Sequence, residues 1–599
     1  MPNPVRVTLV PHTHWDREWY EPFSVFAERL VQMMDTLLDL CAEGYPHFHL
    51  DGQTAMIDDY LERRPERAAE LACYVRAGQL SAGPWVTQMD EFLVSGESHV
   101  RNLRIGLERA RELGDDPIVG YLPDQFGHIG QMPRLLRDAG LGWAMVWRGV
   151  PRAIDRSTFR WQSSGGEAEV LCEYMPFGYA LGGAFREATE PEELATALER
   201  SVELMRPFMV DDRLVIMVGY DHAGPDATLP DKVERAGPLL PGIQARIGSL
   251  RDHLEGRELP FEELPVWRGE LRSSARAHLL PNVVSARAHQ KLERGRVETL
   301  LERYAEPLAE QVPGGVEELE RAWTLLLWNG AHDSACGCSH DQVAADVDAR
   351  LAEARAIAER IVERGPKVRP LPWEFERFGL GEVEWSNVDG EPVELQAKPE
   401  GCDADGVSIG FFDEPDVGDL YNFSWAEEGQ VPSPPDQVAV ASDRFEVGWD
   451  GLSVSVRVWR QGPVLRLAGV IHNEREDHRL RLHVRLPQPA WKVQAGAPFE
   501  LVERPLMGEG GEGEVSSSTW PARHVLTASD VAVLHEGVFE YEICGGHEIA
   551  VTLLRAVACI SRETLPTRPW SAGPRTPTPR AQMLGRTDFA LGLLSRERT

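Results

Sequence analysis

A histidine and an aspartate, His14 and Asp16, follow the first predicted strand of this 599-residue chain, which spans 5–10. Side chains two residues apart on an extended backbone point to the same side, so both can reach one ion. An imidazole and a carboxylate together suit zinc or a similar divalent metal. The competing interpretation is a chance pair of histidines, His12 and His14, near a strand end.

Two further aspartates occupy the same kind of position. Asp124 follows the strand predicted at 118–122, and Asp221 follows the apolar strand predicted at 214–218. Parallel α/β folds place ligand sites at the carboxyl ends of their strands, so these carboxylates can face the cleft that holds His14. Each aspartate alone could instead be a turn residue or a helix cap. A metal, a carboxylate nucleophile and a separate carboxylic acid would together suffice to hydrolyse a glycosidic bond.

The segment 328–340 has two interpretations. It contains His332, Cys336, Cys338 and His340. These four residues could form an independent zinc site, although their spacing is tighter than in common structural zinc sites. Alternatively, His332 reaches the main site as a further ligand, and the cysteines are small buried packing residues.

Hydrophobic periodicity predicts the helices and strands that must position these residues. Residues 1–265 alternate short apolar strands with amphipathic helices, which predicts an α/β catalytic domain with a parallel-stranded barrel or sheet. Residues 266–365 show helical periodicity and no strand signal, which predicts a helical bundle domain that contributes His332. Residues 366–599 alternate apolar and polar positions between prolines and glycines, which predicts an all-β sandwich region.

Composition and charge indicate which partners and which cellular compartment to expect. The formal net charge is −33, so nucleic acid and anionic membranes are not expected as partners. The eight cysteines are too dispersed for a disulfide scaffold, which indicates a reducing compartment. Neither a signal peptide nor an apolar stretch of about 18 residues is apparent, so we expect a cytoplasmic protein. The oligomeric state is left open, a homo-oligomer included.

Five segments carry longer motifs. They are PHTHWDREWY at 11–20, GPWVTQMDEFLVSGESHVRNLRIG at 83–106, YLPDQFGHIGQMPRLL at 121–136, WRG at 147–149 and NGAHDSACGCS at 329–339. Together they resemble the motifs of the family 38 glycoside hydrolases, the α-mannosidases of the bacterial type. The order of α/β, helical and β regions also matches that family, whereas the β region itself matches weakly.

The resemblance implies a metal-dependent retaining α-mannosidase that hydrolyses terminal α-D-mannosides by double displacement. It implies one Zn²⁺ per site, with other divalent metals able to substitute. The implied ligands are His14, Asp16, Asp124 and His332. Asp124 also aligns with the nucleophile and Asp221 with the acid/base. In a retaining enzyme these two carboxyl groups are expected to lie roughly 5–5.5 Å apart.

The resemblance also implies contacts with a carbohydrate substrate. Trp19 aligns with an aromatic residue that stacks on the sugar ring, and Arg148 and Asp333 align with substrate contacts. His12 would orient one of the metal ligands. Trp85 is a further candidate for sugar stacking on residue type alone, with core packing as the alternative.

Two other functions stay open. Relatives often have Asn-Gly-Thr-Asp-His where this chain has the five residues 218–222, Val-Gly-Tyr-Asp-His, and the chain is shorter than typical relatives. These departures are compatible with a catalytically inactive mannoside-binding relative. A metal-dependent sugar deacetylase or amidohydrolase is the other alternative, because His-x-His after a first strand also occurs in those enzymes.

Overall fold

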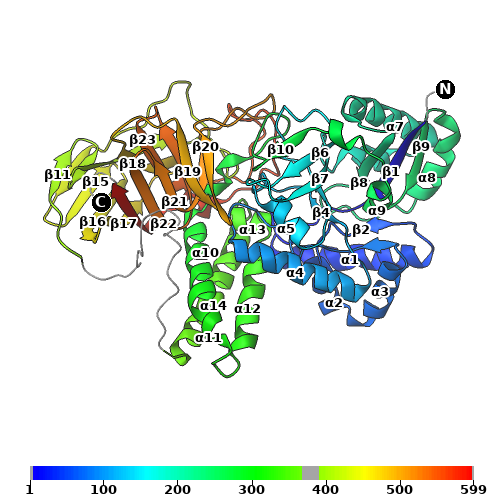
Figure 1. Ribbon diagram of the computed structural model, residues 1–599, viewed down its shortest axis with the longest axis horizontal. Coiled ribbons are helices and arrows are strands. Elements are labelled where there is room, and N and C mark those ends of the chain that lie inside the picture. The colour runs from blue at the N-terminus through cyan, green and yellow to red at the C-terminus, as the bar shows by residue number, and fades with distance from the viewer. Residues whose placement is uncertain (1–3, 367–389, 596–599) are drawn as a thin grey trace.

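The computed structural model describes residues 4–366 and 390–595 (Figure 1). An α/β region, coloured blue to cyan and blue-green, occupies one end of the molecule, and a β-rich region, coloured yellow to red, occupies the other. Long green helices project from the junction between the two. The first part of the β region predicted from 366 onward lies outside the described residues.

The α/β region contains two principal sheets. The first has the order β8-β1-β9, and all its strands are parallel. The second has the order β10-β6-β7-β5-β4, in which β6 and β7 are antiparallel and the other pairs are parallel. The strands of these sheets are β1 (Val5–Pro11), β4 (Val119–Leu122), β5 (Trp143–Val146), β6 (Thr158–Gln162), β7 (Glu169–Tyr174), β8 (Arg213–Val218), β9 (Ile243–Ile247) and β10 (Val266–Arg268).

Helices cover these sheets, and a short parallel pair, β2 (Phe48–His49) and β3 (Leu80–Ser81), lies beside them. The main helices are α1 (Phe23–Ala42), α2 (Ala55–Arg63), α3 (Ala68–Arg76), α4 (Gly96–Leu113), α5 (Met132–Asp138), α7 (Pro191–Met205), α8 (Leu229–Ala236) and α9 (Leu250–Leu254). Six of the seven residues of β1 are buried, as expected for a strand covered on both faces. The predicted α/β region is therefore confirmed.

The prediction missed several strands of this region. It took 214–218 as the last clear strand, but β9 and β10 follow it. β9 alternates half-buried and exposed residues, so it lacks the continuous apolar run that identifies a buried strand. β6 and β7 form an antiparallel pair with polar residues among the apolar ones, so they too lack a continuous apolar run in the sequence.

Helices occupy most of the segment predicted as a bundle. They are α10 (Ala288–Leu300), a π-helical turn (Leu301–Ala305), α11 (Glu306–Ala309), α12 (Gly315–Trp328), α13 (His332–Cys336) and α14 (Asp341–Arg364). A shared apolar core that includes Trp323, Leu326 and Ile357 lies between them. α10 also packs on the β region, because a Cβ atom on Gly295 would lie 2.1 Å from the Cα of Gly537. The limits of a separate helical domain therefore stay a prediction.

The β region is one antiparallel sheet system of 14 strands, which confirms the predicted antiparallel β architecture. Its longest path runs β11-β12-β13-β18-β23-β22-β24-β17-β16-β15-β14, and β19, β20 and β21 branch from β22. The strands are β11 (Leu395–Lys398), β12 (Gly401–Ala404), β13 (Val407–Pro415), β14 (Gln437–Val440), β15 (Arg444–Trp449), β16 (Leu452–Gln461), β17 (Val464–Asn473), β18 (His478–Arg485), β19 (Lys492–Ala497), β20 (Glu500–Pro505), β21 (Trp520–Ala528), β22 (Val531–Cys544), β23 (Glu548–Ala556) and β24 (Gly585–Ser595).

Inward-facing residues of this sheet form the largest apolar core of the molecule, with Phe411, Leu467 and Val533 fully buried. Among the described residues, no helix is both long enough and apolar enough to cross a lipid bilayer.

Candidate active site

The first motif is held in place by strand pairing that continues beyond the strands themselves. β1 and β8 are parallel, and the last pair of their register is Pro11 with Val218. Past this point His14 and Asp221 form an isolated parallel bridge, and His222 N donates to the His14 carbonyl oxygen at 2.7 Å. The carboxyl ends of two strands thereby bring an imidazole and a carboxylate side by side, as the sequence predicted.

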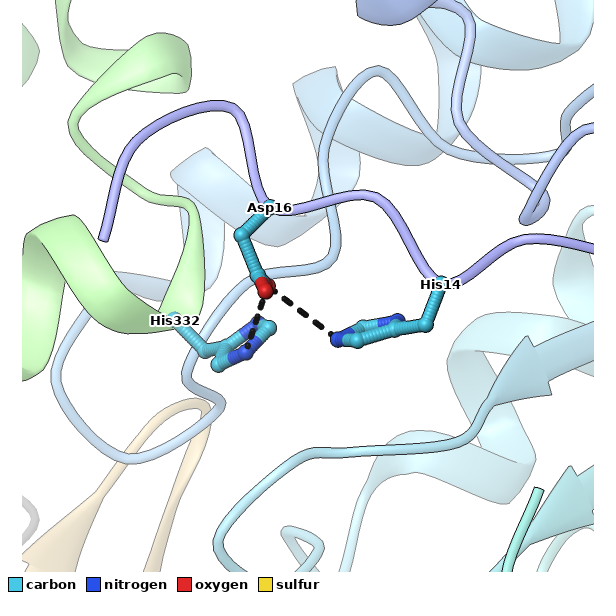
Figure 2. A group of neighbouring side chains, drawn as sticks. All are labelled: His14, Asp16 and His332. Atoms are coloured by element: carbon cyan, nitrogen blue, oxygen red, sulfur yellow. Dashed lines mark ion pairs between the residues drawn. The ribbon is translucent and has the colours of Figure 1, made fainter. Parts of the chain in front are cut away.

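A buried cluster forms where His14, Asp16 and His332 point toward one another (Figure 2). The Oδ1 atom of Asp16 lies 3.1 Å from His14 Nε2 and 3.3 Å from His332 Nε2. One ligand atom from each of the three residues lies within 4.8 Å of the other two. His332 reaches the cluster as the first residue of α13, far from the other two in sequence.

Asp124 completes this arrangement from the end of β4. Its Oδ2 atom lies 3.7 Å from His14 Nε2 and 3.5 Å from His332 Nε2. The structure therefore brings together all four predicted metal ligands. Two imidazole nitrogens and two carboxylates are a donor set that suits zinc or a similar divalent ion. His14 Nε2 and Asp16 Oδ1 are also buried without a hydrogen-bond partner among the described residues, as expected of atoms that bind a metal.

The alternative zinc site at 328–340 does not form among the described residues. Cys336 and Cys338 are buried in an apolar cluster, and Cys338 Sγ contacts the Leu420 carbonyl oxygen at 3.3 Å. The His340 side chain instead accepts a hydrogen bond from Gln342 N at 3.1 Å, at the start of α14. The structure thus favours the interpretation in which His332 serves the main site.

Asp51 orients His14, a role that the sequence analysis did not identify. The Nδ1 atom of His14 lies 3.1 Å from Asp51 Oδ2. That carboxylate also accepts hydrogen bonds from Trp15 N and Gln53 Nε2, both at 2.8 Å, so its position is fixed. A proton on Nδ1 leaves Nε2 free to bind a metal. The resemblance had assigned such a role to His12, but neither ring nitrogen of His12 has a hydrogen-bond partner among the described residues.

A backbone carbonyl group orients the His332 ring in the same way. Its Nδ1 atom lies 3.3 Å from the carbonyl oxygen of Gln88, and its own amide donates to the same oxygen at 2.9 Å. Gln88 in turn donates from its side chain to the Asp51 carbonyl oxygen at 2.6 Å. One hydrogen-bonded network therefore sets the rings of both histidines. Its members come from loops, where no sequence periodicity marks them.

Asp124 lies in a strongly cationic environment. The Arg148 guanidinium donates to Asp124 Oδ1 from Nη2 at 2.7 Å and from Nε at 3.1 Å. Burial alone would raise the pKa of Asp124, but Arg148 and then His332 and His14 lower it to about 2. The side chain is therefore ionised at neutral pH. Arg148, predicted to contact substrate, is held against this carboxylate.

Asp221 lies in the opposite environment. Burial raises the pKa of Asp221 to about 6, and the negative charges of Asp16 and Asp124 act in the same direction against the effect of His14. Tyr179, which the sequence analysis missed, donates from its hydroxyl to Asp221 Oδ1 at 2.8 Å. Two carboxyl groups with pKa values displaced in opposite directions are typical of an acid and a nucleophile in one site.

The other predicted contact residues divide into two groups. Trp19 lies three residues after Asp16 and is buried, and its indole donates to the Tyr421 hydroxyl of the β region at 2.8 Å. Asp333 is buried next to His332, with 3.8 Å between its Oδ2 and His332 Nε2. The structure does not bring Trp85 to the cluster. Trp85 is 2 % exposed in an apolar core, and its indole donates to the Tyr121 carbonyl oxygen, so it is a packing residue.

Comparison with known proteins gives a family for the α/β region. Residues 4–270 match the family model described as "Glycosyl hydrolases family 38 N-terminal domain". A protein of Halalkalibacterium halodurans named "Putative mannosylglycerate hydrolase" is 34% identical over 383 residues, covering 60% of this chain and 42% of that protein. Human alpha-mannosidase 2C1 is 26% identical over 402 residues, covering 60% of this chain and 36% of its own length. The matched part therefore spans less than half of either curated relative.

A solved structure shares the fold along nearly the whole chain. The crystal structure of an alpha-mannosidase from Enterococcus faecalis V583 has a TM-score of 0.82 at 22% identity, covering 98% of this chain and 87% of that chain. At this identity the likeness establishes the fold, including the order of the α/β and β regions.

Replacing Asp51 by asparagine should weaken zinc binding about 10- to 100-fold, because an amide fixes the His14 ring less well and leaves it less basic. Competition against a chelator of known affinity would measure the change. Asp39→Asn is the matched control, since that carboxylate is 72% exposed on α1 and should leave affinity unchanged. Unaltered affinity in Asp51→Asn would contradict the orienting role.

Proposed function

The chain belongs to glycosyl hydrolase family 38 through its N-terminal domain, and we propose on that premise that it is a metal-dependent retaining α-mannosidase. The observation that carries the proposal is the pairing of two unlike carboxyl groups at one buried donor cluster. Asp124 is held ionised by Arg148, and Asp221 has a raised pKa of about 6 beside it. Hydrolysis of a glycoside requires a carboxylate nucleophile and a separate carboxylic acid.

His14, Asp16, Asp124 and His332 would hold the metal. A bound zinc ion would supply positive charge that attracts and orients the hydroxyl oxygens of a sugar at the cluster. Asp51 keeps the Nε2 atom of His14 directed into the cluster. The burial of these groups excludes bulk water, so electrostatic interactions within the site are stronger than in solution.

In the first chemical step, a carboxylate oxygen of Asp124 bonds to the anomeric carbon while the glycosidic C–O bond breaks. Asp221 donates its proton to the departing oxygen. Tyr179 holds the Asp221 carboxyl in place through its hydroxyl hydrogen bond. In the second step Asp221, now ionised, takes a proton from water, whose oxygen displaces Asp124 from the anomeric carbon. The sugar is released with its original configuration.

The substrate is proposed to be a terminal α-D-mannoside. The names of two relatives support this class, since one is named "Putative mannosylglycerate hydrolase" and the other is human alpha-mannosidase 2C1. Asp333, which lies next to His332, and the buried Trp19 are proposed as sugar contacts. A cytoplasmic location and the use of zinc over other divalent metals remain predictions.

The first test is hydrolysis of 4-nitrophenyl α-D-mannoside by the purified protein. We expect turnover with added zinc, loss of turnover after chelation, and recovery when zinc is restored. Asp124→Asn should lower kcat/KM at least about 1,000-fold, because it removes the nucleophile. Circular dichroism of the variant would show that the fold is kept.

Failure of this assay would separate the alternatives. Mannoside binding by calorimetry without turnover under any divalent metal would indicate a catalytically inactive relative. Acetate release from an acetylated sugar, with no mannoside hydrolysis, would indicate a deacetylase. Full activity of Asp124→Asn would exclude the proposed nucleophile.

Asp221→Asn should distinguish substrates by their leaving group. General acid catalysis contributes about 100- to 10,000-fold, and this contribution is needed most when the leaving oxygen is basic. We therefore expect a large loss of kcat/KM for an alkyl mannoside and a much smaller loss for the 4-nitrophenyl compound. Asp231→Asn, at an exposed position on α8, is the control. Equal losses on both substrates would argue against an acid role for Asp221.

Retention of configuration at the anomeric carbon can be measured directly from the product. Proton NMR during hydrolysis of an α-mannoside should show α-mannose as the first product, with the β anomer appearing later by mutarotation. This outcome follows from two successive displacements at the anomeric carbon. Initial formation of the β anomer would exclude a covalent intermediate on Asp124.

A further inference from the structure

Apart from the buried cluster, a pocket lies where the segment after β10 meets β20 and β21 of the β region. Its volume is about 710 Å³, within the range of small-molecule sites. Its walls include Trp267, Arg272, Arg504, Met507 and Trp520. None of the residues of the buried cluster lines this pocket.

Arg272 is the unusual member of this pocket. It is 9% exposed, and no residue in 4–366 or 390–595 forms a hydrogen bond or ion pair with it. Its guanidinium lies 4.5 Å from the ring centroid of Phe92 and 5.8 Å from that of Trp520. Such cation–π contacts compensate only part of the cost of burying a charge.

The charge of Arg272 is retained despite this burial. Burial and then the neighbouring Arg504 lower the pKa of Arg272 to about 10, which leaves the guanidinium protonated at neutral pH. The carboxylates of Glu270 and Asp90 offset part of this charge at longer range, but neither forms a hydrogen bond or ion pair with the guanidinium. A buried cation without a direct partner is destabilising. The Nε atom of Arg272 is buried without a hydrogen-bond partner among the described residues, so this guanidinium is available to an external anion.

The other charged groups around the pocket already have partners. Arg504 pairs with Glu270, with 2.6 Å between Nη2 and Oε1. Arg268 donates to the side-chain oxygen of Gln162 at 3.1 Å. Glu509 accepts a hydrogen bond from the Ser273 hydroxyl at 2.7 Å.

Glu503, also on the wall, pairs with Lys492 at 2.7 Å. Arg272 is therefore the charged group of this pocket that lacks a direct hydrogen bond or ion pair with a described residue. A second polar group points to the same conclusion, because the indole Nε1 of Trp520 is buried with no hydrogen-bond partner among the described residues. Both unpartnered groups are donors, so they call for an acceptor.

We propose that this pocket binds a small organic molecule through a carboxylate or phosphate group held by Arg272. A guanidinium presents a planar fork of donors that matches either oxyanion. The indole N–H of Trp520 would add a further donor. The apolar faces of Trp267, Trp520 and Met507 would contact the body of the ligand. This site is separate from the proposed catalytic cluster and does not depend on its activity.

Isothermal titration calorimetry on the full chain tests the proposal with three probes of similar size. Glucuronate carries a carboxylate, glucose 6-phosphate carries a phosphate, and glucose carries neither. We expect at least one of the two anions to bind about tenfold or more tightly than glucose, and the better anion identifies the preferred group. Arg272→Gln should lower that affinity at least about tenfold, because it removes a charge-assisted hydrogen bond.

Three variants test whether the anion affinity comes from Arg272 and Trp520. Arg268→Gln is the matched control, since it removes a cation from the rim that already has a neutral partner, and it should change affinity less than about twofold. Trp520→Phe keeps the aromatic ring but removes the N–H, and it should weaken binding severalfold. Arg272→Lys keeps the charge without the fork and should also bind more weakly, which tests the site if Arg272→Gln does not fold.

Two results would overturn the proposal. Anions that bind the wild-type chain no better than glucose would show that Arg272 holds no oxyanion. Equal anion affinity in the wild-type chain and in the folded Arg272 variants would place any anion binding elsewhere on the molecule.

Discussion

The structure depends on the burial of two carboxylates and two imidazoles at one point. Asp16 and Asp124 are removed from water together with His14 and His332, and two of the facing atoms, His14 Nε2 and Asp16 Oδ1, have no hydrogen-bond partner in the described part of the chain. Burying like charges this closely is unfavourable unless positive charge offsets them. Arg148 pairs with Asp124, and neighbouring carboxylates raise the pKa values of His14 and His332 against the effect of burial. The four side chains match the donor set of the proposed divalent-metal site, and the surrounding elements hold them together.

The segment that follows His14 joins the α/β region to the rest of the molecule. The Glu18 carboxylate accepts a hydrogen bond from the Ser334 hydroxyl on α13 at 2.6 Å and forms an ion pair with Arg350 on α14. One residue further, Trp19 donates to the Tyr421 hydroxyl of the β region. These buried contacts hold α13, which carries His332, against the strand ends. The site is consequently a product of all three regions.

Electrostatic environment separates groups that are chemically alike. Arg148 is neutralised by Asp124 and keeps that carboxylate ionised, whereas Asp221, bonded to a neutral tyrosine, has a raised pKa. Arg272 differs from Arg148 because that guanidinium is also buried but forms no ion pair with a carboxylate among the described residues. Where a buried charge lacks an internal partner, the pocket around it is the natural place for a ligand.

The sequence alone determined the α/β and β character of the two large regions and the strand-end positions of Asp124 and Asp221, because hydrophobic periodicity and strand ends are local properties. It left His332 with two interpretations, since only tertiary packing brings α13 to the end of β1. It left Trp85 between a sugar contact and core packing, and only the tertiary structure places this residue in an apolar core. It also missed Asp51, whose role depends on a hydrogen bond across 37 residues of chain. Long-range contacts of this kind follow from the closed fold, which no local pattern specifies.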